Sequence, residues 1–149
     1  SDPSNLFYLD SQTDLLLAQE KPEEALTLLQ KHYQLKPNNQ VITLNYANAA
    51  LSAKKFDLAE RLLKYFLLDK PDHPLGMDLM AMTYKSQKNL AAYHETRAGI
   101  YAEHGAYQNS SDEVQKALNQ IEEKDNIKRQ RLQALLKQYR QMQKEIARL

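Results

Sequence analysis

The sequence has no cysteine, which excludes disulfide bonds and thiolate chemistry. It also lacks tryptophan and holds only three glycines and five prolines in 149 residues, so it offers little of what the tight turns of β-sheets need. Runs of about eighteen apolar residues are absent, and the sequence therefore predicts no transmembrane helix. Leucine, alanine, lysine, glutamine and glutamate dominate, and all of them favour helices. We expect an all-α protein.

Charge is nearly balanced overall but uneven along the chain. Residues 1–125 hold 13 Lys and Arg against 18 Asp and Glu, a net charge of −5, whereas residues 126–149 hold seven against one, a net charge of +6. The sequence thus predicts a mildly acidic body that carries a basic terminal helix. The sequence begins with Ser1-Asp2-Pro3 and not with methionine, so we expect a processed product or an excised domain, for which the absence of a signal peptide carries no weight.

One motif recurs with a period of about 34 residues. Ala25, Leu29 and Pro37 are followed at that interval by Ala59, Leu63 and Pro71. Amphipathic segments at 41–53 and 56–69 lie between the two prolines, joined by a polar break at 54–55. A helix–turn–helix hairpin of this length is typical of tetratricopeptide repeats (TPR), which stack because no single hairpin can bury its apolar stripe alone. We therefore expect a right-handed TPR superhelix (α-solenoid) of about seven helices plus a long C-terminal capping helix.

The repeats are predicted at residues 4–37, 38–71 and 72–104, with a degenerate fourth repeat to 123 and an amphipathic basic helix at 125–149. A first helix is expected at 4–20. The sixth segment, 90–104, fits both the second helix of repeat three and the first helix of a fourth repeat. Ser110-x-x-Glu113 is a capping-box pattern, so the seventh helix is expected to begin between Tyr107 and Ser111. Tyr93 and Ser110 stand where the repeat has alanine, which predicts looser packing there.

A narrower resemblance covers nearly the whole chain. The segments that carry it are 7–10 (Phe-Tyr-Leu-Asp), 14–17 (Asp-Leu-Leu-Leu), 41–47, 74–81 and Arg97-Ala98-x-x-Tyr101-Ala102-x-x-Gly105. Together they resemble the carboxy-terminal TPR domain of BepA/YfgC-type periplasmic zinc metallopeptidases. In that family a protease domain precedes the repeats and carries the zinc. The resemblance implies a periplasmic protein whose partners include its own missing protease domain, the β-barrel assembly machinery or unfolded outer-membrane proteins.

Catalytic motifs are not found in the sequence. His94-Glu95-x-x-Ala98 lacks the second histidine that a helical H-E-x-x-H zinc site needs one turn further on. Asp10 and Asp14 are one helical turn apart, and a solvated acidic stripe accounts for them better than a catalytic carboxylate pair. We expect no enzymatic activity, metal or cofactor in this chain, although the parent protein of the resemblance is a zinc metalloprotease.

The resemblance to TPR places the binding groove on the first helix of each hairpin. The positions carried over are Phe7, Asp10, Asp14, Val41, Leu44, Asn45, Asn48, Ser52, Leu75, Asp78, Met82, Lys85 and Glu95. Asn45 and Asn48 could offer donors and acceptors to an extended peptide, or could instead bond between helices. Leu44, Leu75 and Met82 are expected to form an adaptable apolar floor.

The last helix carries a second apolar seam. Its members are Leu132, Leu135, Tyr139, Met142, Ile146 and Leu149. They recur in steps of three and four, as in a coiled coil, but over too few heptads for an independent one. A capping role is favoured over an overhang that binds a partner or a second copy. The acidic body of the chain and the absence of an aromatic platform disfavour nucleic acid as a ligand of its basic face.

The pattern favours a protein–protein interaction module that binds a protein or an extended peptide. Through the resemblance, this module is the detached TPR domain of a periplasmic metalloprotease and chaperone that acts in outer-membrane protein assembly and quality control. The alternative is a stand-alone TPR scaffold that forms homo-oligomers through its terminal helix.

Overall fold

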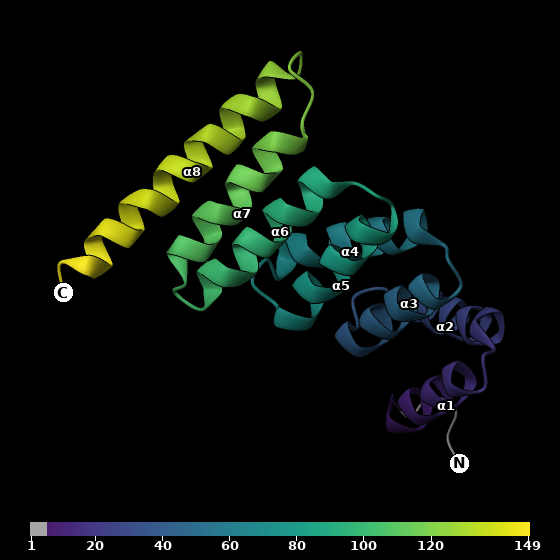
Figure 1. Cartoon of the computed structure of the whole chain (residues 1–149). Helices are drawn as coiled ribbons and strands as arrows, with labels where there is room; N and C mark the ends of the chain where they lie inside the picture. Colours follow the sequence, from purple (N-terminus) through teal and green to yellow (C-terminus); the bar gives the residue numbers. More distant parts are fainter. Residues whose placement is uncertain (1–5) are drawn as a thin grey trace. The chain divides into compact units, whose positions relative to one another are not determined.

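The computed structural model describes residues 6–149, with side chains from Leu9 onward. The described residues form eight α-helices and no strand (Figure 1). The helices are α1 (Leu6–Ala18), α2 (Pro22–Leu35), α3 (Gln40–Ser52), α4 (Phe56–Asp69), α5 (Pro74–Ser86), α6 (Leu90–Glu103), α7 (Tyr107–Gln120) and α8 (Asn126–Ala147). The expected all-α TPR class is thus confirmed. The chain divides within α5 into two compact units, Ser1–Thr83 and Tyr84–Leu149.

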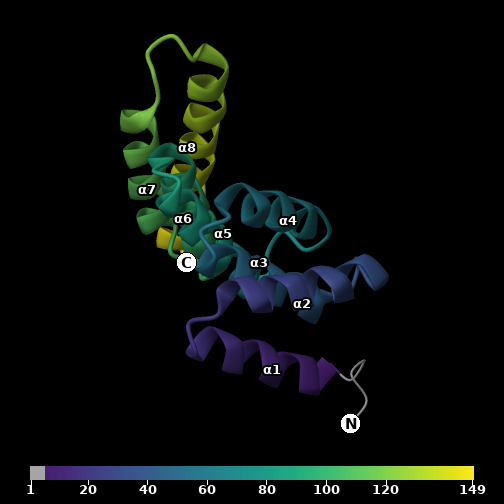
Figure 2. The ribbon, with the colours of Figure 1, turned by 90° about the vertical axis from the view of Figure 1, so that its right-hand side faces the viewer.

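The first unit is built on the repeat period found in the sequence. Ala25 and Leu29 of α2 are fully buried, and so are their counterparts Ala59 and Leu63 of α4. Helix α3 packs against both α2 and α4, and α1 packs against α2 and α3 (Figure 2). Ala47 of α3 is also fully buried, because only a small side chain lets neighbouring helices approach this closely. These contacts bury the stripes that helices of thirteen or fourteen residues could not shelter alone.

The turns repeat with the same period. Glu20, Lys54 and Lys88 have positive φ angles of 57°, 60° and 61°, and they are equally spaced along the chain. Each precedes a residue whose N–H bonds a carbonyl five residues back, as in Lys55 N to Ala50 O at 2.8 Å, which is the Schellman arrangement. Gly105, with φ of 71°, ends α6 in the same way, through Ala106 N to Tyr101 O at 3.0 Å.

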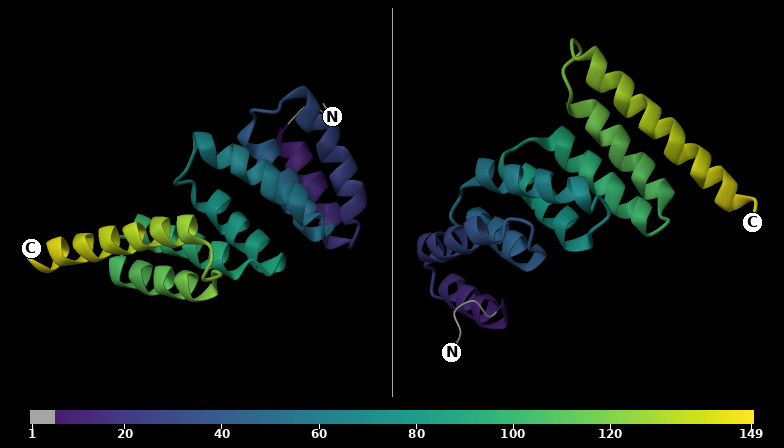
Figure 3. Two further views of the ribbon diagram at one scale, coloured as in Figure 1. Left: turned by 90° about the horizontal axis from the view of Figure 1, so that it is seen from above. Right: turned by 180° about the vertical axis from the view of Figure 1, so that it is seen from behind.

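Helix α6 therefore has features of both predicted frames. It follows a Schellman turn at Lys88, as a second helix does, and it ends in one at Gly105, as a first helix does. It packs closely along α7, and α8 runs back along α7 on the other side (Figures 1 and 3). The core of this second unit contains Ala98, Val114, Ala117, Leu118, Leu132 and Leu136.

The expected capping box of α7 is wrong. The helix begins at Tyr107 after the N-cap Ala106, which makes no side-chain cap. Ser110 and Glu113 consequently lie inside the helix, and both are buried. Ser110 Oγ donates to the carbonyl oxygen of Ala98 at 2.8 Å, so this residue ties α7 to α6 where loose packing was expected. Side-chain caps are present at the starts of α3 and α8, where Asn39 and Asp125 accept from the N–H of Ile42 and Lys128.

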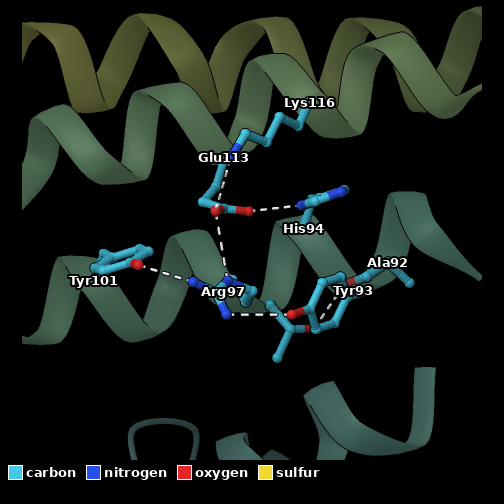
Figure 4. A network of polar contacts seen from close by, with 8 residues as sticks. Ala92, Tyr93, His94, Arg97, Tyr101, Glu113 and Lys116 are labelled. Carbon is cyan, nitrogen blue, oxygen red and sulfur yellow. Dashed lines mark hydrogen bonds and ion pairs between the residues drawn. The ribbon is translucent and has the colours of Figure 1, made fainter. Parts of the chain in front are cut away.

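Glu113 is the centre of a polar network between α6 and α7 (Figure 4). Its carboxylate accepts from His94 Nδ1 at 2.7 Å and lies 3.4 Å from Arg97 Nε and from Lys116 Nζ. Arg97 also donates to the hydroxyls of Tyr93 and Tyr101, at 3.2 and 2.8 Å. Burial on its own raises the pKa of Glu113, but the His94 hydrogen bond and the nearby cations outweigh it, so the pKa lies below its ordinary value.

Adjacent serines of α7 provide the first prediction. Ser110 is fully buried and donates to Ala98, whereas Ser111 Oγ is buried without a hydrogen-bond partner among the described residues. Both changes, Ser110→Ala and Ser111→Ala, gain the same helix propensity. We therefore expect Ser111→Ala to be the more stable variant by about 1 kcal/mol in the free energy of unfolding. Urea denaturation followed by circular dichroism measures the difference, and equal stabilities would contradict the structure.

Glu113 provides the second prediction. Its pKa is lowered by folding, so its stabilising effect is complete above the unfolded pKa of about 4.3 and is lost as the pH falls through the lower folded value. We expect Glu113→Gln to reduce the free energy of unfolding at pH 7 by about 1–3 kcal/mol. The variant should also lose less free energy of unfolding than the unsubstituted chain on going from pH 7 to below about pH 4. Exposed Glu103→Gln is the control, and an equal pH dependence of parent and Glu113→Gln would refute the role.

Candidate functional site

Helix α3 presents one polar stripe on the side away from its core contacts. Val41, Asn45, Asn48 and Ser52 follow one another in steps of four, three and four, which places them on one helix face. Val41 is 39% exposed, the two asparagines are half-buried and Ser52 is exposed. This stripe is therefore open to solvent, and its contact with a ligand stays a prediction of the repeat resemblance.

Asn45 is already engaged within the protein. Its Nδ2 donates to Oδ1 of Asp10 on α1 at 2.8 Å, so the alternative of an inter-helix hydrogen bond is right for this residue. The bond fixes both side chains and uses part of the hydrogen-bonding capacity of each. Asn48 makes no side-chain hydrogen bond to any other described residue. Of the two asparagines, Asn48 is therefore the one with its donors and acceptor uncommitted.

The predicted apolar floor of the groove was Leu44, Leu75 and Met82, and the prediction is wrong for Leu44. Leu44 is only 7% exposed and belongs to the core, so it offers no open surface. Leu75 and Met82 of α5 are 50% and 55% exposed, and they flank the exposed Asp78 on one face of that helix. With Val41, these two residues supply the apolar surface available at the predicted positions.

Carboxylates dominate the charge at the predicted positions of the first unit. Asp14 on α1 and Asp78 on α5 are exposed, and Asp10 is half-buried by its bond to Asn45. No cation stands among the predicted positions of this unit. The predicted Phe7 lies in α1, but its side chain is outside the part of the structure described here.

Two predicted positions belong to the second unit. Lys85 is exposed, and its Nζ lies 5.7 Å from the ring centroid of Tyr93. Glu95 accepts two hydrogen bonds from Arg131 of α8, which raise the pKa of the guanidinium. Glu95 thus holds α8 in place, a role that the groove assignment did not anticipate.

The seam of α8 is only partly available. Leu132 is buried, and Leu135 and Tyr139 pack against the core together with Leu136, which the seam had left out. Burial raises the pKa of Tyr139, whose ring lies 6.2 Å from that of Tyr107. Ile146 and Leu149 are 43% and 105% exposed, and Met142 is half-buried. The first part of the helix therefore caps the second unit, as predicted, while its last turns stay open.

His94 and Glu95, which resemble the start of an H-E-x-x-H zinc motif, bond to other side chains. His94 bonds Glu113 and Glu95 pairs with Arg131, so the two side chains serve different helices. Across residues 6–149 no three His, Asp or Glu side chains gather as a metal ion would need. None of the helices that the structure describes is long and apolar enough to cross a membrane.

Some exposed apolar residues were left unassigned by the sequence analysis. Tyr65 and Leu68 of α4 are 58% and 83% exposed, and Leu35 at the end of α2 is 74% exposed. For the two residues of α4, the signal in the sequence is the spacing of Leu58, Leu62, Tyr65 and Leu68, which leads from the buried Leu62 to the exposed side of the helix.

Comparison with known proteins agrees with the repeat assignment. Residues 16–82 match a tetratricopeptide repeat family model. The chain is 30% identical over 143 residues, 96% of its length, to the beta-barrel assembly-enhancing protease of Escherichia coli (strain K12). It is 33% identical over 100 residues, 64% of its length, to the protein of the same name from Yersinia pestis.

The chain spans 29% of the Escherichia coli protein and 21% of the Yersinia pestis protein. The similarity thus concerns one segment of these proteases. Together with the buried alanines and the turns that recur at the repeat interval, the matches identify residues 16–82 as tetratricopeptide repeats, within a chain that resembles a segment of the beta-barrel assembly-enhancing proteases.

Proposed function

We propose that this chain is the protein-binding module of a periplasmic protease and chaperone that acts in outer-membrane protein assembly and quality control. The observation that carries the proposal is that 96% of the chain's length aligns, at 30% identity, with a segment of a protein named beta-barrel assembly-enhancing protease. Tetratricopeptide repeats act by presenting side chains to partner proteins, and the chemistry of the whole protease would lie in the remaining sequence. The periplasmic location rests on the same similarity.

The ligand is an extended, positively charged segment of a client or partner. Asp14 and Asp78 give the first-helix face of the first unit a negative charge, and Val41, Leu75 and Met82 add exposed apolar surface. Alternating apolar and basic side chains, as in a strand of an unfolded β-barrel protein, match both features. The β-barrel assembly machinery and the protease domain of the parent protein are the other partners that the similarity suggests.

Removing the acidic charge should weaken this binding. We expect Asp14→Asn with Asp78→Asn to raise the Kd of a twelve-residue peptide of alternating Val and Lys by about three- to tenfold at low salt, because each exposed ion pair is worth up to about 1 kcal/mol. Fluorescence anisotropy of the labelled peptide measures the change. The matched control, Glu122→Gln with Glu123→Gln, removes two exposed charges from the α7–α8 linker. Equal effects of the two double variants would reject this face as the site.

The two asparagines should separate binding from stability. We expect Asn48→Ala to raise the Kd of the same peptide by about two- to tenfold without changing Tm, because its side chain makes no bond within the described chain. Asn45→Ala should lower Tm as well, because Asp10 loses its donor. Thermal unfolding by circular dichroism and the same titration test both statements. An unchanged affinity of Asn48→Ala would argue against ligand contact at α3.

A further inference from the structure

A second surface of the first unit lies on the opposite side of α3. Its floor is Tyr46, and one cleft of about 370 Å³ runs between Gln30 and Tyr33 of α2 and Arg61 and Tyr65 of α4. Successive residues of a helix are about 100° apart, so Tyr46 points away from the stripe that begins at Val41. This surface, which we call the α2/α4 face, is therefore separate from the groove assigned to the first helices.

Two more clefts continue this one along α4. A cleft of about 420 Å³ at the start of the helix shares Leu58 and Arg61 with it. Another of about 590 Å³ at the end of the helix shares Tyr65. The three clefts thus follow one another along a helix of 14 residues, which is about 21 Å long.

The side chains along this run combine apolar anchors with polar neighbours. Tyr65 and Leu68 are 58% and 83% exposed although they are large and apolar. Such residues gathered on one face mark protein interaction sites, and tyrosine and arginine are the types most enriched at the centres of interfaces. The amides of Gln30 and Gln34 and the hydroxyl of Tyr33 can pair with polar groups of a partner.

Charge identifies the kind of partner. The three clefts are lined by four cations, Lys54, Lys55, Arg61 and Lys70, and by two carboxylates, Asp57 and Asp69, which gives a net charge of +2. Residues 1–125 as a whole carry a net charge of −5, so this face is positive within an otherwise acidic body. An acidic ligand is therefore attracted to the α2/α4 face and repelled by the aspartates of the first-helix face.

We propose that the α2/α4 face docks an acidic segment of a partner protein, about fourteen residues long, with leucine or aromatic side chains spaced three and four residues apart. The apolar side chains of the segment contact Tyr65 and Leu68, and its carboxylates lie near Lys54, Lys55 and Arg61 at the start of α4. The module thus binds two different chains at once, one on each side of α3.

The test uses the full chain and two labelled fourteen-residue peptides. One has Leu at spacings of three and four with Glu between, and the other has Lys in place of Glu. We expect the Glu peptide to bind, with Kd raised at least about tenfold by Arg61→Glu and by Leu68→Ser. The matched controls are Arg140→Glu and Ile127→Ser on α8, since Ile127 is 84% exposed and Leu68 is 83% exposed. These controls should leave Kd within about twofold of the parent value.

Several results would overturn the proposal. They are no binding of the Glu peptide, equal losses in the α4 variants and the α8 controls, or a Glu peptide that Asp14→Asn with Asp78→Asn weakens. Because the mutated side chains of α4 and α8 are exposed, unchanged thermal unfolding should accompany every variant. Failure of the α4 variants alone leaves the Val–Lys peptide result intact, so the two surfaces are judged separately.

Discussion

Close approach of helices at small side chains is the constraint on which the rest of this structure depends. Ala25, Ala47, Ala59 and Ala98 have no exposed surface, and a larger side chain at any of them would hold two helices apart. At Gly76 even the smallest side chain is too large, because a Cβ there would lie 2.9 Å from the ring of Phe66. Once helices are this close, their apolar stripes are buried, and helices that would be marginal alone become stable. The outward faces of α3 and α4 remain exposed in part, and these are the faces for which we propose ligands.

The sequence predicted the structure well where this constraint makes the same residue types recur at a regular interval. The regular interval of alanine, leucine and proline recurs in α2 and α4, and the segment predicted at 56–69 is α4 to the residue, Phe56–Asp69. It did not predict the left-handed turns, because Glu20, Lys54 and Lys88 occupy positions where glycine would have been the signal. The predicted start of α7, between Tyr107 and Ser111, includes the observed Tyr107, but the predicted cap is wrong, because Ser110 and Glu113 imitate a capping box while the packing of α7 on α6 buries both.

Tertiary polar contacts explain why the candidate site was harder to predict than the fold. Repeat position says which way a side chain points, but it does not say which neighbour takes its hydrogen bonds. Asn45 donates a hydrogen bond to Asp10, which lies 35 positions earlier in the sequence. Glu95 accepts one from Arg131, which lies 36 positions later. Both residues therefore contribute to holding helices together. Asn48 and Asp14 remain open because no partner of theirs lies within the described chain at these distances.

The two surfaces on either side of α3 differ in charge, and this difference affects whether the two proposed ligands bind together. A basic segment on the first-helix face and an acidic segment on the α2/α4 face neutralise opposite charges on the same small unit. Each bound segment therefore reduces the charge that repels the other ligand, which favours joint occupancy at low salt. The coupling is electrostatic across α3, and screening shortens its range to about 10 Å at 0.1 M salt. Cooperativity that persisted in high salt would have to come from a change in helix packing instead.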